Sequence, residues 1–289
     1  MIRFGPAGNG NSFYEAGHKS SLEIPEYLAD VGLNAYEYQC GRGVNVKGEF
    51  CRQLAAKARE YKIFLSLHAP YFINLGTSDP KVMESSLRHI AKSLAAAKDM
   101  EATRIVVHPG SVGKNSRSEA LARAERLLAQ TAAELMPSFP GISLCLETMG
   151  KINQLGTLDE VIGLCKLDKC FMPTIDFGHL HARDLGAIKG RDEFEEVLDR
   201  IASSLGAEVV QNLHVHFSAI EFARGGEIRH RTFAEREYGP DFEPLAAIIA
   251  RDRLTPVIIS ESAGAQTEDA LAMKELVQRY QTGEGGRDV

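Results

Sequence analysis

Histidine and acidic residues stand at the ends of six short apolar runs in this sequence. The runs and their polar ends are FLSLHAP with His68, RIVVHPG with His108, SLCLETM with Glu147, PTIDFGH with Asp176 and His179, NLHVHFS with His214 and His216, and VIISES with Glu261. Imidazole and carboxylate groups together are typical ligands of zinc, manganese and iron. The repetition therefore predicts a site that binds divalent metal.

Each of these residues, taken alone, has a simpler interpretation. A single histidine at a strand end is more often a hydrogen-bonded structural residue than a ligand, and a single glutamate is more often a solvated charge. Six such ends in one chain favour metal binding over separate structural roles. His214 and His216 are two residues apart, so in a strand both would point to one face and either could be the ligand.

The elements that would position these side chains are read from the same runs. Apolar runs that stop at a polar residue are typical of buried parallel strands whose carboxyl ends face an active site. Strands are predicted at 2–7, 34–39, 63–69, 104–109, 142–148, 173–178, 212–218 and 256–262. Helices are predicted at 21–31, 48–61, 80–99, 117–136, 157–166, 192–204, 241–252 and 268–280. Asp79-Pro80, and Thr157 followed by Glu160, are typical helix starts.

Eight strands, each followed by a helix, predict an α/β fold made of a single (β/α)8 TIM barrel. A doubly wound open sheet is the alternative, but no GxGxxG motif follows the first strand. The domain is expected to cover residues 1–282, with a disordered tail at 283–289. Residues 219–240 are predicted to form a long loop at the active-site end of the barrel, where long loops usually have a function.

Composition indicates a globular enzyme. The 289 residues are 44% hydrophobic and 25% charged, and the formal charge of −6 does not indicate a strongly basic nucleic-acid-binding protein. The sequence contains no apolar run of 18 residues and its N-terminus does not read as a signal peptide, so we expect no membrane association. Five cysteines without a CxxC pair indicate reduced thiols and a cytoplasmic protein.

The number of candidate ligands exceeds what one ion needs. Glu147, Asp176, His214 and Glu261 would supply one ligand from each of strands five to eight, and the two histidines of strands three and four would add two imidazoles. Two or three metals that share a bridging carboxylate fit this number better than a single tetrahedral ion. Glu147 stands between the two groups in strand order and is the expected bridge.

Several of these segments resemble the endonuclease IV family of apurinic/apyrimidinic endonucleases, within the xylose isomerase-like TIM barrel superfamily. The similar segments are His68-Ala-Pro-Tyr-Phe-Ile-Asn-Leu, Val-His108-Pro-Gly-Ser, Leu-Glu147-Thr-Met-Gly, Ile-Asp176-Phe-Gly-His179 and Ser-Glu261-Ser. The resemblance covers essentially the whole chain. It implies an enzyme that uses zinc to hydrolyse the DNA phosphodiester 5′ to an abasic sugar.

The resemblance also implies a role for each candidate residue. One zinc would be bound by His68, His108 and Glu147, a second by Glu147, Asp176, His214 and Glu261, and a third by His179 with Glu227 and His230 of the long loop. Glu147, Asp176 and Glu261 would be the catalytic carboxylates, with Glu261 helping to orient the attacking hydroxide. Tyr71, Asn74 and Arg42 would contact abasic-site DNA.

The sequence departs from the family pattern in ways that leave alternatives open. The loop contains Glu227-Ile-Arg-His230 where the family has Asp-x-His, and strand seven contains HVHFS where the family has His-Leu-Asn-Asp, so a two-metal site is an alternative. Manganese is an alternative to zinc, because it takes the same imidazole and carboxylate ligands. The loop after strand two, CGRGVN, has no large aromatic residue. The other functional class is a sugar isomerase or epimerase with one divalent ion, in which the two glutamates act as acid and base.

Overall fold

The computed structural model describes residues 1–114 and 116–284 and contains all eight predicted strands. Their bounds are β1 (Arg3–Pro6), β2 (Ala35–Gln39), β3 (Phe64–His68), β4 (Arg104–Val107), β5 (Ser143–Glu147), β6 (Phe171–Asp176), β7 (His214–Phe217) and β10 (Val257–Ser260). The strands are parallel neighbours in the order β1-β10-β7-β6-β5-β4-β3-β2. This sequential order confirms the TIM barrel and is not that of a doubly wound sheet.

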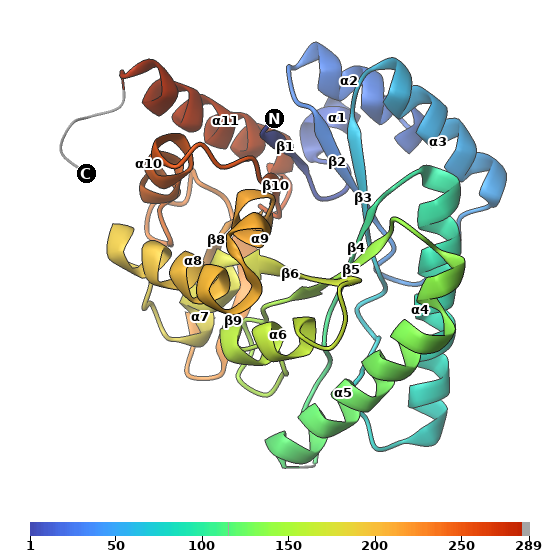
Figure 1. Cartoon of the computed structure of the whole chain (residues 1–289). Helices are drawn as coiled ribbons and strands as arrows, with labels where there is room; N and C mark the ends of the chain where they lie inside the picture. The colour runs from blue at the N-terminus through green and yellow to red at the C-terminus, as the bar shows by residue number, and fades with distance from the viewer. Residues whose placement is uncertain (115, 285–289) are drawn as a thin grey trace.

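Eight predicted helices follow the strands and surround them on the outside (Figure 1). Their bounds are α2 (Ile24–Asp30), α3 (Gly48–Glu60), α4 (Pro80–Met100), α5 (Arg117–Glu134), α6 (Leu158–Cys165), α8 (Arg191–Leu205), α10 (Glu243–Arg251) and α11 (Gln266–Thr282). The predicted caps are present: Asp79 accepts a hydrogen bond from the Lys81 amide, and Thr157 forms a capping box with Glu160. Among the described residues, no helix is long and apolar enough to cross a membrane.

The barrel closes between its first two strands. The Asn34 amide donates to the Phe4 carbonyl at 3.1 Å, and the Gly8 amide donates to the Glu37 carbonyl at 2.9 Å. A Cβ built on Gly5 would lie 1.8 Å from the Ala35 carbonyl oxygen, so only glycine lets the two backbones approach this closely. The closure brings β2 next to β1 and across the barrel from the middle strands.

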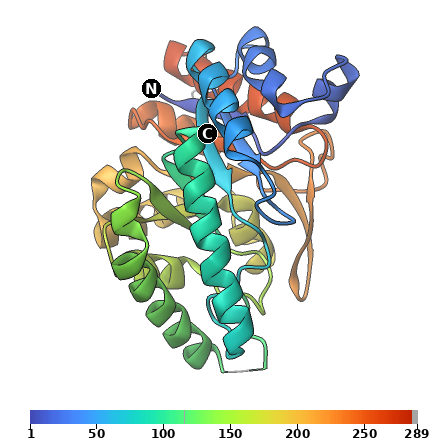
Figure 2. The same ribbon diagram turned by 90° about the vertical axis from the view of Figure 1, so that its right-hand side faces the viewer.

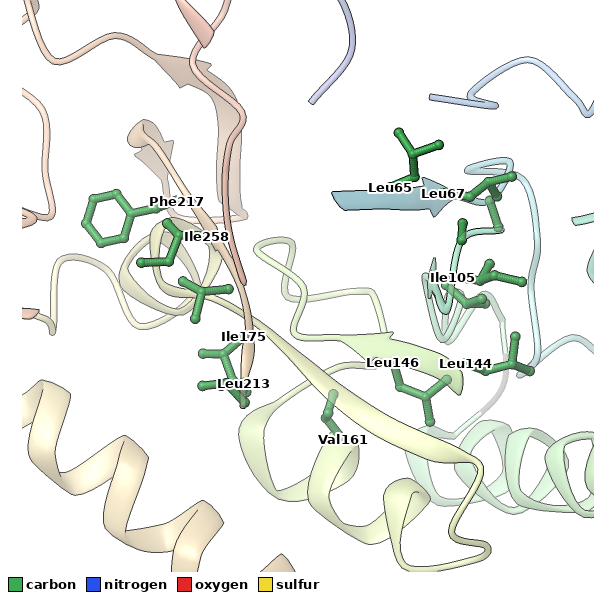
Figure 3. Close-up of a cluster of buried hydrophobic side chains, with 14 of the residues drawn as sticks. Leu65, Leu67, Ile105, Leu144, Leu146, Val161, Ile175, Leu213, Phe217 and Ile258 are labelled. Carbon is green, nitrogen blue, oxygen red and sulfur yellow. The ribbon is translucent and has the colours of Figure 1, made fainter. Parts of the chain in front are cut away.

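Alternate residues of the strands separate an apolar outer layer from the barrel interior. Figure 3 shows part of the outer layer, in which side chains of the strands pack with Val161 of α6. The other labelled residues lie in the strands or next to them and are Leu65, Leu67, Ile105, Leu144, Leu146, Ile175, Leu213, Phe217 and Ile258. The interior contains a small apolar cluster of Ala7, Ala35, Val257 and Ile259. The last inward positions of the strands carry polar groups, because the strand period of two turns every polar end residue to one side.

The structure corrects the prediction of a loop at 219–240. Residues there form an antiparallel ribbon of β8 (Ala219–Ala223) and β9 (Gly226–Arg231), which projects from the barrel in Figure 2. Three short helices were also missed, namely α1 (Asn11–Glu15), α7 (Phe177–Arg183) and α9 (Ala207–Gln211). The ribbon and these helices are too short to show a clear apolar period, and tertiary contacts stabilise them. Residues 285–289 of the predicted tail lie outside the described residues.

Candidate metal centre

The predicted strand-end residues meet at the carboxyl mouth of the barrel. A cavity of about 580 Å³ opens there, and six of the candidate ligands line it: His68, His108, His179, Glu227, His230 and Glu261. Glu147, Asp176 and His216 lie at its floor and are fully buried. Parallel strands of a closed barrel all deliver their last inward residue to one end, which is why residues far apart in sequence converge.

The first cluster joins β3, β4 and β5. His108 Nε2 lies 2.9 Å from Glu147 Oε2, and His68 Nε2 lies 3.5 Å from the same oxygen. A hydrogen bond of 2.7 Å between His68 Nδ1 and the Ala69 carbonyl oxygen makes Nδ1 the donor, so His68 presents Nε2 to the cluster. These three residues are a His₂Glu set with ligand atoms close enough to hold one ion.

A second cluster shares the same glutamate. It consists of Glu147, Asp176, His216 and Glu261, whose ligand atoms all lie within 4.8 Å of one another. His216 Nδ1 is 3.1 Å from Glu147 Oε1 and 3.5 Å from Glu261 Oε2. The two oxygens of Glu147 thus face different clusters, which is the arrangement expected of a bridging carboxylate.

A third group lies between α7 and the β8–β9 ribbon. It contains Asp176, His179, His230 and Glu261. Glu227 adds an oxygen 3.5 Å from His179 Nε2. The Asp176 side chain accepts from the His179 amide at 2.7 Å and so caps α7, which places His179 one turn beyond the strand end.

The ribbon is held in place by the loop after β5. The Glu227 amide donates to the Gly150 carbonyl at 3.1 Å, and the Ile152 amide donates to the Gly225 carbonyl at 3.1 Å. Gly226 has φ +89°, and a Cβ on it would lie 2.1 Å from the Gly150 oxygen. Ser218 Oγ lies 2.7 Å from His230 Nδ1 and orients that ring. Docking of the ribbon therefore brings Glu227 and His230 to the cavity.

The structure separates the two histidines that sequence reasoning left equivalent. His216 belongs to the second cluster, whereas His214 lies one step deeper, with its Nε2 3.0 Å from Glu37 Oε2. Glu37, His214 and His216 form a further buried group whose ligand atoms lie within 4.8 Å of one another. Burial lowers the pKa of His214 to about 4, although the Glu37 carboxylate opposes this. Sequence reasoning missed Glu37, which is fully buried in β2 within the run AYEYQ. A lone acid inside a strand run was the available signal.

Neighbouring charges shift the pKa values of the buried groups in opposite directions. Burial alone would raise the pKa of Glu261, but His216 lowers it to about 2. Burial raises the pKa of Asp176 to about 6 in spite of His179, and Glu261 adds to the rise. Burial would lower the pKa of His179, but Asp176 and Glu147 raise it to about 9. Such a set of opposed shifts is typical of a functional site.

The residues fit a divalent metal. Glu147 Oε2 and Asp176 Oδ2 are buried and have no hydrogen-bond partner among the described residues, although imidazole nitrogens stand 2.9–3.5 Å away. Buried carboxylate oxygens without a partner are rare in native proteins, because their desolvation is costly. Imidazole nitrogens that converge on carboxylate oxygens left without a hydrogen bond are the donor set of a metal ion.

The three predicted substrate residues have different positions. Tyr71 is 57% exposed, lines the cavity, and its ring centroid lies 6.2 Å from that of His108. Arg42 is exposed on the turn after β2. Its neighbour Gly41 packs against Tyr71, because a Cβ built on Gly41 would lie 2.1 Å from the Tyr71 hydroxyl oxygen. Asn74 joins its own loop to the loop after β4, because its Oδ1 accepts from the Gly76 and Ser111 amides. Of the three, only Tyr71 is among the described residues that line the cavity.

Comparison with known proteins agrees with this architecture. The chain is 28% identical over 274 residues to an uncharacterized protein of Methanocaldococcus jannaschii, covering 95% of this chain and 96% of that one. It is 25% identical to a probable endonuclease 4 of Listeria monocytogenes, over 84% of this chain and 82% of that protein. It is 29% identical to a probable endonuclease 4 of Ureaplasma urealyticum, over 53% of this chain and 51% of that protein.

Solved structures share the fold at lower identity. Endonuclease IV from Thermus thermophilus superposes with a TM-score of 0.62 at 19% identity, covering 91% of this chain and 95% of that chain. An L-ribulose 3-epimerase superposes with a TM-score of 0.68 at 13% identity over the whole of both chains. The sequence profile of the family described as xylose isomerase-like TIM barrel matches residues 25–281. This chain belongs to the xylose isomerase-like TIM barrel family.

Proposed function

We propose that this protein is a metal-dependent phosphodiesterase that cleaves DNA on the 5′ side of abasic sites. The observation that carries the proposal is the His68–His108–Glu147 cluster beside a second cluster that shares Glu147. A mononuclear sugar enzyme needs only the second cluster, whereas two adjacent ions suit an in-line attack on phosphate. The curated relatives named probable endonuclease 4 support the same reading.

The chain's own residues would hold two or three zinc ions, with manganese as the alternative. Metals bound at these residues would lower the pKa of a water molecule and neutralise the negative charge of the phosphate. Glu147 would fix the spacing between the first two sites, because both its oxygens are engaged. Glu261, at the cavity wall with its pKa held near 2 by His216, stays ionised and can accept a hydrogen bond from the nucleophile.

A third site would complete the centre on the ribbon side. His179, Glu227 and His230 provide its ligands, and the 3.5 Å between His179 Nε2 and Glu227 Oε2 leaves room for both to bind one ion after small adjustments. The extra residue between Glu227 and His230 is accommodated by the ribbon, whose register shifts between Glu221 and Phe222. An ion held by these residues would supply positive charge to stabilise the leaving 3′ oxygen.

Substrate contacts would come from the rim of the cavity. Tyr71 presents an exposed ring above His108, where it can stack on an unpaired base or sugar. Lys151 also lines the cavity and offers a cation to a phosphate oxygen. Arg42 stands on the turn that contacts Tyr71, within reach of the same strand of DNA. A DNA-repair role would place the protein in the cytoplasm, which its five free cysteines fit.

The test is incubation of zinc-loaded protein with a duplex that carries one tetrahydrofuran abasic analogue. We expect a single nick 5′ to the analogue and no nick in the undamaged duplex of the same sequence. Elemental analysis of the same sample should give two or three metals per chain. If no duplex is nicked with zinc or manganese, the proposal is wrong.

A sugar epimerase is the second candidate. Its support is the second cluster, in which Glu147 and Glu261 lie in one metal group as an acid–base pair would. A cavity of about 580 Å³ also has the size of a small-molecule site. One exchangeable manganese per chain, together with interconversion of ketose epimers, would favour this reading over the first.

A further inference from the structure

A largely buried polar chain lies directly beneath the metal centre, and only its last member belongs to that centre. It runs from Arg104 on β4 through His214 on β7 to Glu37 on β2, and ends at His216. Glu37, His214 and His216 are fully buried. Closure of the barrel next to β1 places β2 three strands from β7 in the barrel order, and Glu37 reaches through the interior to both imidazoles.

The direction of the hydrogen bonds in this chain is set by its first member. A guanidinium group can only donate. Arg104 Nη1 lies 3.5 Å from His214 Nδ1, and its other nitrogen Nη2 donates to the Asn212 carbonyl at 2.7 Å. His214 Nδ1 is therefore the acceptor, and its proton sits on Nε2. That nitrogen donates to Glu37 Oε2 at 3.0 Å.

Glu37 is surrounded by donors. Ser66 Oγ donates to Oε2 at 2.9 Å, and Gln39 Nε2 donates to Oε1 at 3.2 Å. With the two imidazoles, four groups face the two oxygens of one carboxylate. A fully engaged buried carboxylate remains ionised and has no proton to donate.

His216 is held between Glu37 and the metal centre. Its Nε2 lies 3.1 Å from Glu37 Oε1 in an ion-pair contact that does not have hydrogen-bond geometry. Its Nδ1 lies 3.1 Å from Glu147 Oε1 and 3.5 Å from Glu261 Oε2. The ionised Glu37 carboxylate beside Nε2 favours a proton on that nitrogen, which leaves Nδ1 as the nitrogen available to a metal. Ligating histidines generally bond through their other nitrogen to such a carboxylate, which fixes ring and tautomer.

We infer that Glu37, oriented by Arg104 through His214, is the positioning residue that makes His216 an Nδ1 metal ligand. His214 then serves as a neutral relay and is not a ligand. The inference rests on the metal centre of the proposed function, but not on which reaction that centre performs.

Long-range ¹H–¹⁵N spectra of the full-length ¹⁵N-labelled protein test this directly. Single His214→Gln and His216→Gln variants assign the two rings. We expect His214 to show the neutral Nε2–H tautomer both without metal and with zinc, and His216 to show zinc on Nδ1 and a proton on Nε2. Zinc coordination by His214, or a proton on His216 Nδ1 in the zinc form, would overturn the inference.

Variants of Glu37 and Ser66 provide the matched comparison. Glu37→Gln has one acceptor oxygen for two imidazoles, so zinc affinity of the second cluster should fall by about 10–100-fold in chelator competition. Ser66→Ala removes one donor from the same carboxylate and leaves both imidazole contacts, so its zinc affinity should stay near wild type. Equal losses in both would mean that the chain only supports packing. If Glu37→Gln does not fold, the wild-type spectra still decide.

The two proposals fail in distinguishable ways. Zinc bound through His216 Nδ1 without nicking of abasic DNA would reject the phosphodiesterase and keep the role of Glu37. Nicking by a protein whose His214 binds zinc would do the reverse.

Discussion

Removal of His108 separates the two functional readings most sharply. In His108→Ala the first cluster keeps only His68 and Glu147, and Glu147 is also required by the second cluster. We expect the loss of one metal per chain. A bound metal contributes several kcal/mol to stabilising charge in the transition state. A loss of about 4 kcal/mol corresponds to a decrease in kcat of roughly a thousandfold.

The cost of this change to folding should be smaller. Glu147 loses the contact of 2.9 Å to His108 but keeps His216 at 3.1 Å, so the free energy of unfolding should fall by about 1–3 kcal/mol. The single-metal epimerase reading leaves all four residues of the second cluster in place and expects only a small change in kcat. His18→Ala is the matched control, since that ring stacks on Phe13 at 4.9 Å and is not among the described residues that line the cavity.

The assay combines elemental analysis with single-turnover nicking of the abasic-analogue duplex, normalised to the folded fraction. Unchanged metal content in His108→Ala, with nicking close to that of wild type, would refute the claim that His68, His108 and Glu147 bind a metal.

Three further predictions follow from individual contacts. In metal-free folded protein the pKa of His179 is about 9, above its ordinary value of 6.5, so protonation of this ring stabilises the fold. The stabilisation is complete below pH 6.5 and is lost as pH rises through 9, so the free energy of unfolding in urea should decline by on the order of 3 kcal/mol. An unfolding free energy that does not change over this pH range would contradict the prediction. Arg183 donates hydrogen bonds to four carbonyls of the loop at 149–154. Arg183→Lys should therefore lower the free energy of unfolding in urea by about 2–4 kcal/mol and speed amide exchange in that loop. Unchanged amide exchange would show that Arg183 does not stabilise the loop. Tyr71→Ala should raise KM for abasic DNA on the order of tenfold with little change in kcat, whereas Tyr71→Phe should not; equal KM in the two variants would exclude stacking.

Local sequence determined the strands and most helices. A buried parallel strand requires a continuous apolar run, and a helix requires an apolar face with a cap, so both leave a readable trace such as the Thr157–Glu160 box. The convergence of His68, His108 and Glu147 could also be predicted, because closure of eight parallel strands fixes where their ends meet. The β8–β9 ribbon could not, since its stability comes from docking on the loop at Gly150 rather than from its own apolar pattern.

The division of labour between His214 and His216 was decided only by tertiary structure. Strand period places both side chains inside the barrel, and nothing local distinguishes them. The distinction comes from two distant residues, Arg104 and Glu37, which face His214 from β4 and β2. Residue type and spacing thus determine which groups enter the barrel, whereas the partners across its interior determine which nitrogen, and which histidine, is left to face a metal.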